Sequence, residues 1–179
     1  LRTLKDFDID IPEDYQYVIN LAVEMDYQYV RHYPSYLGSA CTGLGYSKMA
    51  ITAGFLAQFL RQLGCMAIPC GNDTAMGIPS SIQAGLGELG RNGLVITQEC
   101  GPRVRLCKVF TNIPMVCDEP VEFGVKEFCD KCKLCATTCP VDAISGGERT
   151  RKGYNRSNSD GPLKWYVDGE ACHQYWSKS

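Results

Sequence analysis

Four clustered cysteines constrain the structure of this chain more than any other feature of its sequence. They occupy positions 129, 132, 135 and 139, and Pro140 follows the last of them, so the run reads C-x2-C-x2-C-x3-C-P. This tight spacing lets three thiolates converge on one iron–sulfur cluster, while the proline turns the chain and directs the fourth thiolate elsewhere. The sequence therefore predicts that Cys129, Cys132 and Cys135 ligate one [4Fe–4S] cluster and that Cys139 points to a second one.

The cysteine count leaves this second cluster incomplete. Each four-iron cluster needs four thiolates, and beyond the run only Cys172 remains in the C-terminal region. We expect Cys139 and Cys172 to share the second cluster with cysteines of a segment beyond Ser179; the alternative is that this chain lacks the second site. The residues after the proline, Val141 to Ile144, resemble the short helix that follows the motif in bacterial ferredoxins.

A zinc site or a set of disulfides could also produce clustered cysteines. Four thiolates can hold zinc tetrahedrally, but structural zinc sites usually combine two separated C-x2-C pairs. A disulfide framework suits small chains without a core of their own, whereas this chain has 179 residues, 45% of them hydrophobic. The remaining upstream cysteines are scattered among apolar residues, and we expect small buried hydrophobes at Cys41, Cys65, Cys70, Cys100, Cys107 and Cys117.

Charge and hydropathy argue against two classes of partner. A net charge of −2 without a run of like charges provides no basic field for a nucleic-acid backbone. No stretch reaches the ~20 apolar residues of a membrane-spanning helix, and no signal peptide opens the chain, so we expect the chain as it stands to be soluble. Because it starts at Leu1 and ends at Ser179 without a tail signature, we expect a fragment of a longer protein.

Upstream of the cysteines, predicted helices and strands alternate. Apolar periodicity predicts three helices, over residues 12–30, 46–63 and 80–89. Gly64 closes the second helix in a left-handed conformation. Apolar runs between turn residues predict three strands, over residues 65–70, 94–97 and 104–110. This alternation favours the α+β or α/β class. The domain boundary lies near Glu119 and Pro120, and the polar residues 146–161 predict a long exposed loop in the smaller domain.

Three upstream segments resemble the corrinoid-binding core of the reductive dehalogenases. They are Ile78-Pro79-Ser80, residues 85–97 (GLGELGRNGLVIT) and residues 101–105 (GPRVR). The more distant epoxyqueuosine reductases share parts of this pattern. With the cysteine run at the expected interval, the resemblance extends from about Tyr27 to Trp176. It implies an α+β fold in which a partial nitroreductase-like cobamide-binding core, residues 1–119, precedes a truncated ferredoxin-like iron–sulfur domain, residues 120–179.

The resemblance also implies a bound cobamide. The residues that it assigns to cobamide binding are Thr42, Met76, Pro79, Gly85, Gly87, Gly90, Arg91, Asn92, Gly93 and Thr97. Glycines here would let the backbone approach the flat macrocycle; the alternative is a glycine-rich turn packed tightly against a strand. The D-x-H-x-x-G signature that supplies a histidine to cobalt elsewhere is absent, which implies a base-off cobamide without a protein axial ligand. We interpret His32 as a structural residue.

Reductive dehalogenation needs a proton donor as well as a reductant. It replaces a carbon–halogen bond by carbon–hydrogen, consumes two electrons and one proton, and releases halide. The resemblance places the donor at Tyr46, with Asn72 and Arg105 at supporting polar positions. A phenol gives up its proton more readily beside a fixed cation, and guanidinium is always charged. Lys48 is an alternative cation, although side chains at i and i+2 of a helix point apart.

These features predict a corrinoid-dependent reductive dehalogenase of anaerobic organohalide respiration, with electrons reaching the cobamide through [4Fe–4S] clusters. One alternative is an epoxyqueuosine reductase acting on tRNA, a family that uses an acidic residue as its acid and shows a basic surface. The second alternative is a plain electron-transfer ferredoxin. The resemblance further implies a small organohalide substrate, a small membrane anchor protein, a position on the outer face of the bacterial cytoplasmic membrane, and a homodimer. It leaves the identity of the organohalide open.

Overall fold

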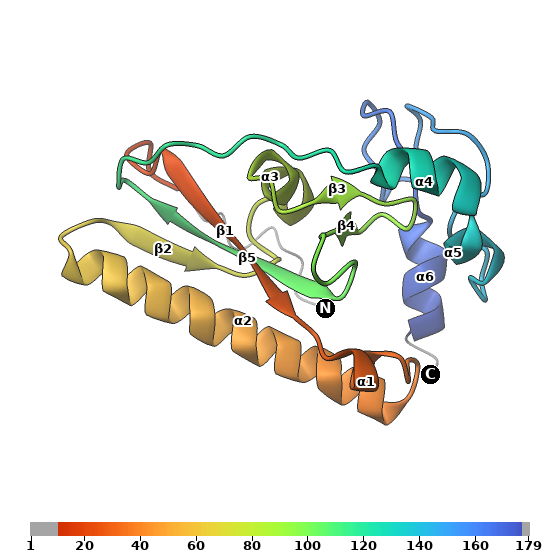
Figure 1. Cartoon of the computed structure of the whole chain (residues 1–179), viewed down its shortest axis with the longest axis horizontal. Helices are drawn as coiled ribbons and strands as arrows, with labels where there is room; N and C mark the ends of the chain where they lie inside the picture. The colour runs from red at the N-terminus through yellow and green to blue at the C-terminus, as the bar shows by residue number, and fades with distance from the viewer. Residues whose placement is uncertain (1–10, 177–179) are drawn as a thin grey trace.

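The computed structural model describes residues 11–176, and its upstream part contains a three-stranded antiparallel sheet (Figure 1). The strands are β1 (Tyr17–Glu24), β2 (Ala67–Cys70) and β5 (Val104–Thr111). β5 is central, with β1 and β2 antiparallel on either side of it. The predicted strands over residues 65–70 and 104–110 are thereby confirmed. Both ends of the predicted domains, residues 1–10 and 177–179, lie outside the described residues.

The strand β1 shows that the helix predicted over residues 12–30 is wrong. Its sequence, YVINLAVE, is rich in β-branched and aromatic residues, which pack well on a pleated surface. All eight residues pair with β5, from Tyr17 opposite Thr111 to Glu24 opposite Val104. Apolar spacing alone does not separate such a segment from a helix. Within that range only α1 (Tyr27–Val30), a single turn capped by Asp26, is helical.

The long helix α2 (Tyr36–Gln62) covers one face of the sheet (Figure 1). It begins well before the predicted residue 46, because Ser35 caps it: the Ser35 hydroxyl oxygen accepts a hydrogen bond from the Gly38 N–H at 3.4 Å. It ends as predicted, with Gly64 in the left-handed region at φ 84°. Its inner residues pack on the sheet in a core that contains Met49, Ala53, Ala57, Leu60, Ala67, Cys107 and Val109.

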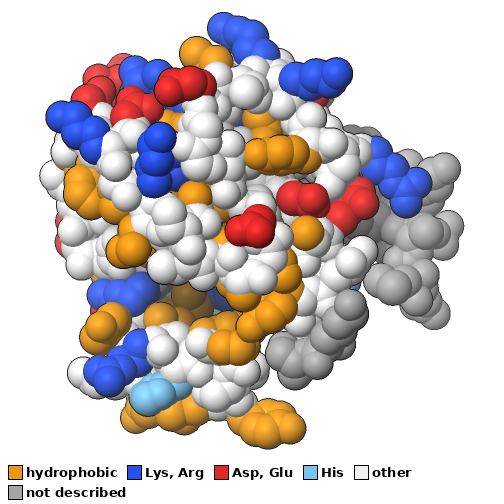
Figure 2. Space-filling model, turned by 90° about the vertical axis from the view of Figure 1, so that its right-hand side faces the viewer, with side chains coloured by type: hydrophobic (Ala, Val, Ile, Leu, Met, Phe, Trp, Pro, Cys, Tyr) orange, Lys and Arg blue, Asp and Glu red, His pale blue; other side chains and the backbone are white. Residues whose placement is uncertain are grey.

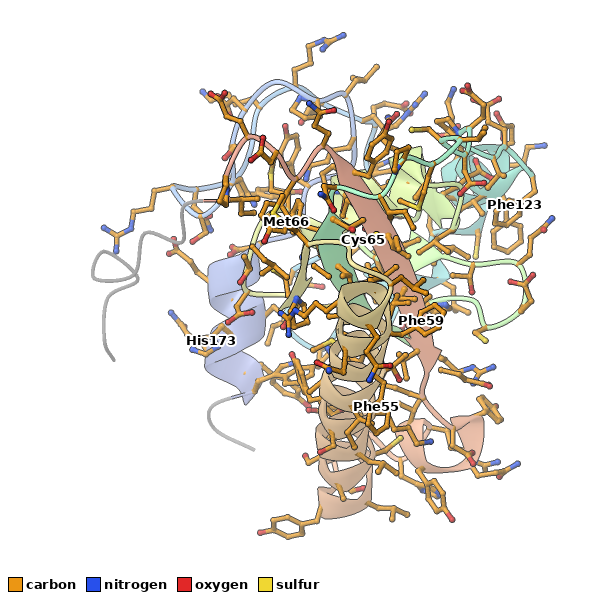
Figure 3. All side chains as sticks on the ribbon, turned by 90° about the vertical axis from the view of Figure 1, so that its left-hand side faces the viewer. Phe55, Phe59, Cys65, Met66, Phe123 and His173 are labelled. Carbon is orange, nitrogen blue, oxygen red and sulfur yellow. The ribbon has the colours of Figure 1, made fainter. Side chains whose placement is uncertain are left out.

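The outer face of α2 also carries large apolar side chains. Ile51, Phe55 and Phe59 are all more than half exposed, and Figure 3 shows Phe55 and Phe59 along the same helix. The helix is therefore apolar on both faces. For that reason its sequence predicts a helix without identifying the face that packs on the sheet.

A short helix and a hairpin lie between the sheet and the C-terminal part (Figure 1). The helix α3 (Gly77–Gln83) precedes β3 (Glu88–Leu89), which pairs antiparallel with β4 (Val95–Ile96). The helix predicted over residues 80–89 is thus too long at its end. Gly85 adopts φ 70°, which turns the chain out of the helix and toward β3. The strand predicted over residues 94–97 is confirmed as β4.

The C-terminal part holds three short helices: α4 (Val125–Cys132), α5 (Leu134–Thr137) and α6 (Gly169–Trp176). Lys133, with φ 52°, separates the first two. The short helix predicted over residues 141–144 does not form, because Asp142 has φ 50° and Ile144 instead bridges to Val167. Residues 146–161 form a mostly exposed loop without a regular helix or strand, as predicted.

Helices and antiparallel strands together confirm the predicted α+β class. On the face that includes the C-terminal part, Lys and Arg side chains are interspersed with Asp and Glu (Figure 2). This face therefore carries no field of a single sign. Within residues 11–176, no helix combines the length and apolar character needed to cross a membrane.

Candidate catalytic and iron–sulfur sites

Three side chains predicted to be catalytic meet in the structure. Tyr46 lies on α2, Asn72 follows β2 and Arg105 lies on β5. The Tyr46 hydroxyl oxygen accepts hydrogen bonds from the Asn72 amide at 3.4 Å and from the Arg105 guanidinium at 3.5 Å. Both bonds are long, as is common for catalytic contacts before substrate is bound. Negative charge that develops on this oxygen is stabilised by two N–H donors, one of them cationic.

Arg105 is fixed against α2 by close packing and by one further hydrogen bond. Its guanidinium carbon lies 4.6 Å from the centroid of the Tyr46 ring, and its Nη2 donates to the Thr42 hydroxyl at 3.4 Å. Gly45 makes this approach feasible, since a Cβ there would lie 3.1 Å from Arg105 Cγ. The Nε of Arg105 is buried without a hydrogen-bond partner among the described residues. The cation beside the phenol is thus Arg105, whereas Lys48 is exposed.

Lys108 supports this site, and sequence reasoning missed it. Its side chain is 1% exposed, and its Nζ donates to the Gly71 carbonyl at 2.8 Å. This bond ties the loop that carries Asn72 to the central strand. Burial lowers the pKa of Lys108, while Cys70 and then Asp73 oppose that shift. The available signal was a lysine inside the otherwise apolar run of β5, a position where a charged side chain needs a partner.

The predicted cobamide-lining glycines pack against their own hairpin. A Cβ on Gly87 would overlap the carbonyl oxygen of Ile96, and one on Gly90 would lie 2.8 Å from Asn92 Oδ1. The same Asn92 oxygen accepts a hydrogen bond from the Leu94 N–H at 3.1 Å, which closes the turn. The tight-turn alternative therefore accounts for these two glycines within the protein itself.

Gly85 and Gly93 are required for a different reason. Both have positive φ, 70° and 77°, which side-chain-bearing residues rarely adopt. A Cβ on Gly85 would also lie 2.8 Å from the Glu119 carbonyl oxygen, and one on Gly93 3.0 Å from Val167. The hairpin thus packs directly against Glu119, in the segment that leads into the C-terminal part, and against Val167 within that part.

The remaining predicted cobamide residues have mixed environments. Met76, the residue before α3, is 75% exposed, and Pro79 lies within α3. Thr97 is buried, and its hydroxyl donates to the Gly101 carbonyl at 3.2 Å and accepts from the Cys100 N–H at 3.1 Å. Thr97 therefore stabilises the turn after β4, while the side chain of Met76 is exposed at the surface.

The side chain of Arg91 forms hydrogen bonds with the cysteine run and with the loop that follows it. It is 2% exposed, and its Nε donates to the Cys129 carbonyl at 3.0 Å. Its Nη1 donates to the carbonyls of Ser145 at 2.7 Å and Gly147 at 2.9 Å. The guanidinium carbon also lies 4.4 Å from the centroid of the Trp165 ring. The role of Arg91 in cobamide binding stays a prediction, beside these observed contacts of its side chain.

Four cysteines of the C-terminal part fall into two pairs that interact electrostatically, Cys129 with Cys135 and Cys139 with Cys172. Burial, and next the nearby Cys129, raise the pKa of the Cys135 thiol. Burial, and next the nearby Cys139, raise the pKa of the Cys172 thiol. Cys129 Sγ accepts a backbone N–H from Arg91 at 3.5 Å, and Cys139 Sγ accepts one from Ala143 at 3.3 Å. Backbone donors of this kind stabilise thiolates that are bound to iron.

The cysteines on α4 and α5 have the spacing of ligands of a four-iron cluster. In residues 11–176, no three His, Cys, Asp or Glu side chains are grouped so that they could hold one metal ion. A four-iron cluster binds each thiolate through a different iron, so its ligands need not meet at one point. The short helices α4 and α5 carry Cys129, Cys132 and Cys135, with the left-handed Lys133 between them. These residues fit a [4Fe–4S] cluster.

The scattered cysteines follow their prediction only in part. Cys41, Cys70 and Cys107 are buried, as small hydrophobes should be. Cys65 and Cys100 are half-buried. Cys117 is exposed, because it lies in the extended segment between β5 and α4, so the prediction of burial is wrong there. His32 is exposed as well.

Comparisons with known proteins address both sites. A family model described as a 4Fe-4S binding domain matches residues 125–145, which contain the four clustered cysteines. The tetrachloroethene reductive dehalogenase of Desulfitobacterium hafniense is 47% identical over 164 residues, which is 89% of this chain and 30% of that protein. This chain therefore spans less than a third of the length of that relative.

A solved structure extends the likeness to the fold. The catabolic reductive dehalogenase NpRdhA matches with a TM-score of 0.78 and 28% identity, over 88% of this chain and 22% of that one. The epoxyqueuosine reductase of Escherichia coli is 39% identical over only 66 residues, 37% of this chain and 16% of that protein. The alternative that acts on tRNA thus has the weaker and more partial match.

Proposed function

We propose that this chain, which is homologous over 89% of its length to a section of the tetrachloroethene reductive dehalogenases, forms the cobamide-facing core and cluster motif of an enzyme of that kind. The reaction takes an organohalide, two electrons and one proton to the hydrogen-substituted product and a halide ion. In this proposal the cysteine run carries the electrons and Tyr46 provides the proton. The substrate class is a small halogenated hydrocarbon.

In this proposal the cobamide would contact Thr42 beside Arg105, Met76 and Pro79 at the start of α3, and the backbone of the hairpin. A bound cobamide supplies a strongly reducing cobalt centre for cleavage of the carbon–halogen bond. Two observations support the fit: the Nε of Arg105 is a buried donor without a partner among the described residues, and Met76 is 75% exposed. We propose the base-off form of the cofactor and a nitroreductase-like arrangement of the core.

Tyr46 would act as the acid. As its proton leaves for the substrate carbon, negative charge develops on the phenolic oxygen, where Arg105 and Asn72 already donate. Arg105 stabilises this charge electrostatically, and Asn72 orients the hydroxyl. Lys108 acts indirectly, because it holds the Gly71 carbonyl next to Asn72. The convergence of these donors on Tyr46 is the observation that carries the proposal.

Other parts of the proposal concern the whole protein. Cys139 and Cys172 would ligate a second [4Fe–4S] cluster that further cysteines complete. The nearby Cys139 contributes to the raised pKa of the Cys172 thiol, which supports a shared site. A small membrane anchor partner, a position on the outer face of the cytoplasmic membrane and a homodimer are proposed from the family alone.

A halide-release assay tests the function. The anaerobic protein, loaded with cobamide and iron–sulfur cluster and reduced chemically, is mixed with tetrachloroethene, and chloride is measured by ion chromatography. We expect chloride release that requires both the reductant and the cobamide. Absence of halide release from protein that demonstrably holds both cofactors, across chlorinated alkenes, alkanes and phenols, would contradict the proposal.

A further inference from the structure

Among residues 11–176, Arg91 is a buried cation without a carboxylate partner. It lies in the turn between β3 and β4, and its side chain is 2% exposed. In the part of the chain that the structure describes, an ion pair joins Arg103 and Glu24, and none involves Arg91. Three backbone carbonyls satisfy its hydrogen bonds, but neutral carbonyls do not compensate a full charge. A buried guanidinium of this kind needs an anion close by.

A four-iron cluster bound at Cys129 would provide that anion. Arg91 reaches Cys129 twice, through its backbone N–H to Sγ at 3.5 Å and through Nε to the carbonyl at 3.0 Å. A four-iron cluster with thiolate ligands is anionic, and it becomes more negative when it accepts an electron. Net charge and hydrogen bonds to the sulfurs are among the factors that set cluster potentials. A fixed cation at this place stabilises the reduced cluster more than the oxidised one.

We infer that Arg91 is a positioning residue that raises the reduction potential of the first cluster through its positive charge and its hydrogen bonds to Cys129. The inference requires a cluster on Cys129 but does not require the proposed dehalogenation. Because Arg91 lies in the glycine-rich hairpin, it also connects that hairpin to α4 and to the loop that contains Ser145 and Gly147.

Arg149 offers a matched control for the charge. Its guanidinium lies 5.5 Å from the same Trp165 ring that contacts Arg91 at 4.4 Å. The hydrogen bonds to Cys129 come from Arg91 and not from Arg149. Arg149→Gln therefore removes the same unit of charge from the same ring without removing a bond to Cys129.

The test is an EPR-monitored redox titration of the full chain, reconstituted anaerobically with iron and sulfide, together with iron analysis. The variants are Arg91→Gln, Arg91→Lys and Arg149→Gln. At a fixed applied potential, we expect the ratio of reduced to oxidised cluster to fall about tenfold in Arg91→Gln, which is a shift of about 59 mV for a one-electron couple. Arg91→Lys should remain close to the parent, and so should Arg149→Gln.

An Arg91→Gln variant that keeps its iron and titrates like the parent would overturn the inference, and so would an equal shift in Arg149→Gln. If Arg91→Gln loses its iron, Arg91→Lys decides the question. Full iron content and the parental potential in the lysine variant support the inference, whereas loss of iron there too assigns Arg91 a purely structural role. Halide release is not measured, so these outcomes are independent of the proposed function.

Discussion

At the residue scale, the candidate acid Tyr46 accepts hydrogen bonds from side chains of two segments that are distant from it in sequence. Tyr46 and Arg105 are separated by 59 positions, and Tyr46 and Asn72 by 26. Family resemblance could predict these three residues, because each stands in a segment with a recognisable pattern. Lys108 could not be predicted in this way, since its role depends on the strand pairing that places it beside Gly71.

The hydroxyl of Tyr46 provides a direct mutational test of the acid. Tyr46→Phe retains the ring that stacks with Arg105 and removes only the proton donor. We expect halide release to fall by about 10²- to 10⁴-fold, the usual contribution of a positioned acid, with cobalt and iron content unchanged. Tyr154→Phe, a change at an exposed tyrosine of the loop, should leave the rate unchanged. A cofactor-replete Tyr46→Phe protein with parental activity would refute the acid role.

Serine variants of a clustered cysteine and of the exposed Cys117 distinguish iron ligation from the mere presence of a thiol. Serine is a poor ligand for iron, so Cys132→Ser should lose most of the iron and the visible absorbance of the cluster. Cys117→Ser removes an exposed thiol outside the matched motif and should retain both. Colorimetric iron analysis after anaerobic reconstitution distinguishes the two. Equal iron content in both variants would show that Cys132 is not a ligand.

Thiol reactivity should follow burial. Burial raises the pKa of Cys107, and its side chain is 2% exposed. At pH 9 an unperturbed thiol, with a pKa of about 8.5, is mostly thiolate, whereas Cys107 stays protonated to a higher pH because burial raises its pKa. Iodoacetamide at pH 9 should therefore label Cys117 rapidly and Cys107 only after unfolding, as measured by peptide mass spectrometry. Rapid labelling of Cys107 in the folded protein would contradict its place in the core.

At the element scale, the successes and failures of sequence reasoning have identifiable causes. Turn glycines and the strand pattern of residues 104–110 predicted β4, β5 and the end of α2. The segment that forms β1 was predicted as a helix, because local periodicity contains no information about its pairing with β5. The iron–sulfur motif was predictable from spacing alone, whereas the route of the Arg91 side chain depends on how the hairpin packs on the C-terminal part.

Two glycine-to-alanine substitutions with opposite expected effects on the free energy of unfolding test the packing of the hairpin. A Cβ on Gly87 would overlap the Ile96 carbonyl, whereas a Cβ on Gly54 of α2 meets nothing within 4 Å. We expect Gly87→Ala to lower the free energy of unfolding by about 1–3 kcal/mol through overpacking. Gly54→Ala should raise it by roughly 0.5–1 kcal/mol, because alanine loses less backbone entropy in a helix. Urea unfolding monitored by circular dichroism measures both; equal stability of the two variants would contradict the described hairpin.

At the scale of the whole molecule, the hairpin joins the two candidate sites. Gly93 packs on Val167 and Gly85 on Glu119, and Arg91 in the turn of the hairpin bonds to Cys129 of α4. Figure 1 shows this hairpin and α3 between the sheet and the C-terminal helices.

The central claim is that one protein holds a corrinoid beside an iron–sulfur cluster. The visible absorbance spectrum of the anaerobically purified holo-protein, together with cobalt and iron analysis, tests it most directly. We expect a corrinoid band superimposed on the broad absorbance of the cluster, with cobalt and protein in equimolar amounts. Cluster absorbance alone, with iron present and cobalt absent even after incubation with a cobamide, would contradict this claim and identify an electron-transfer ferredoxin instead.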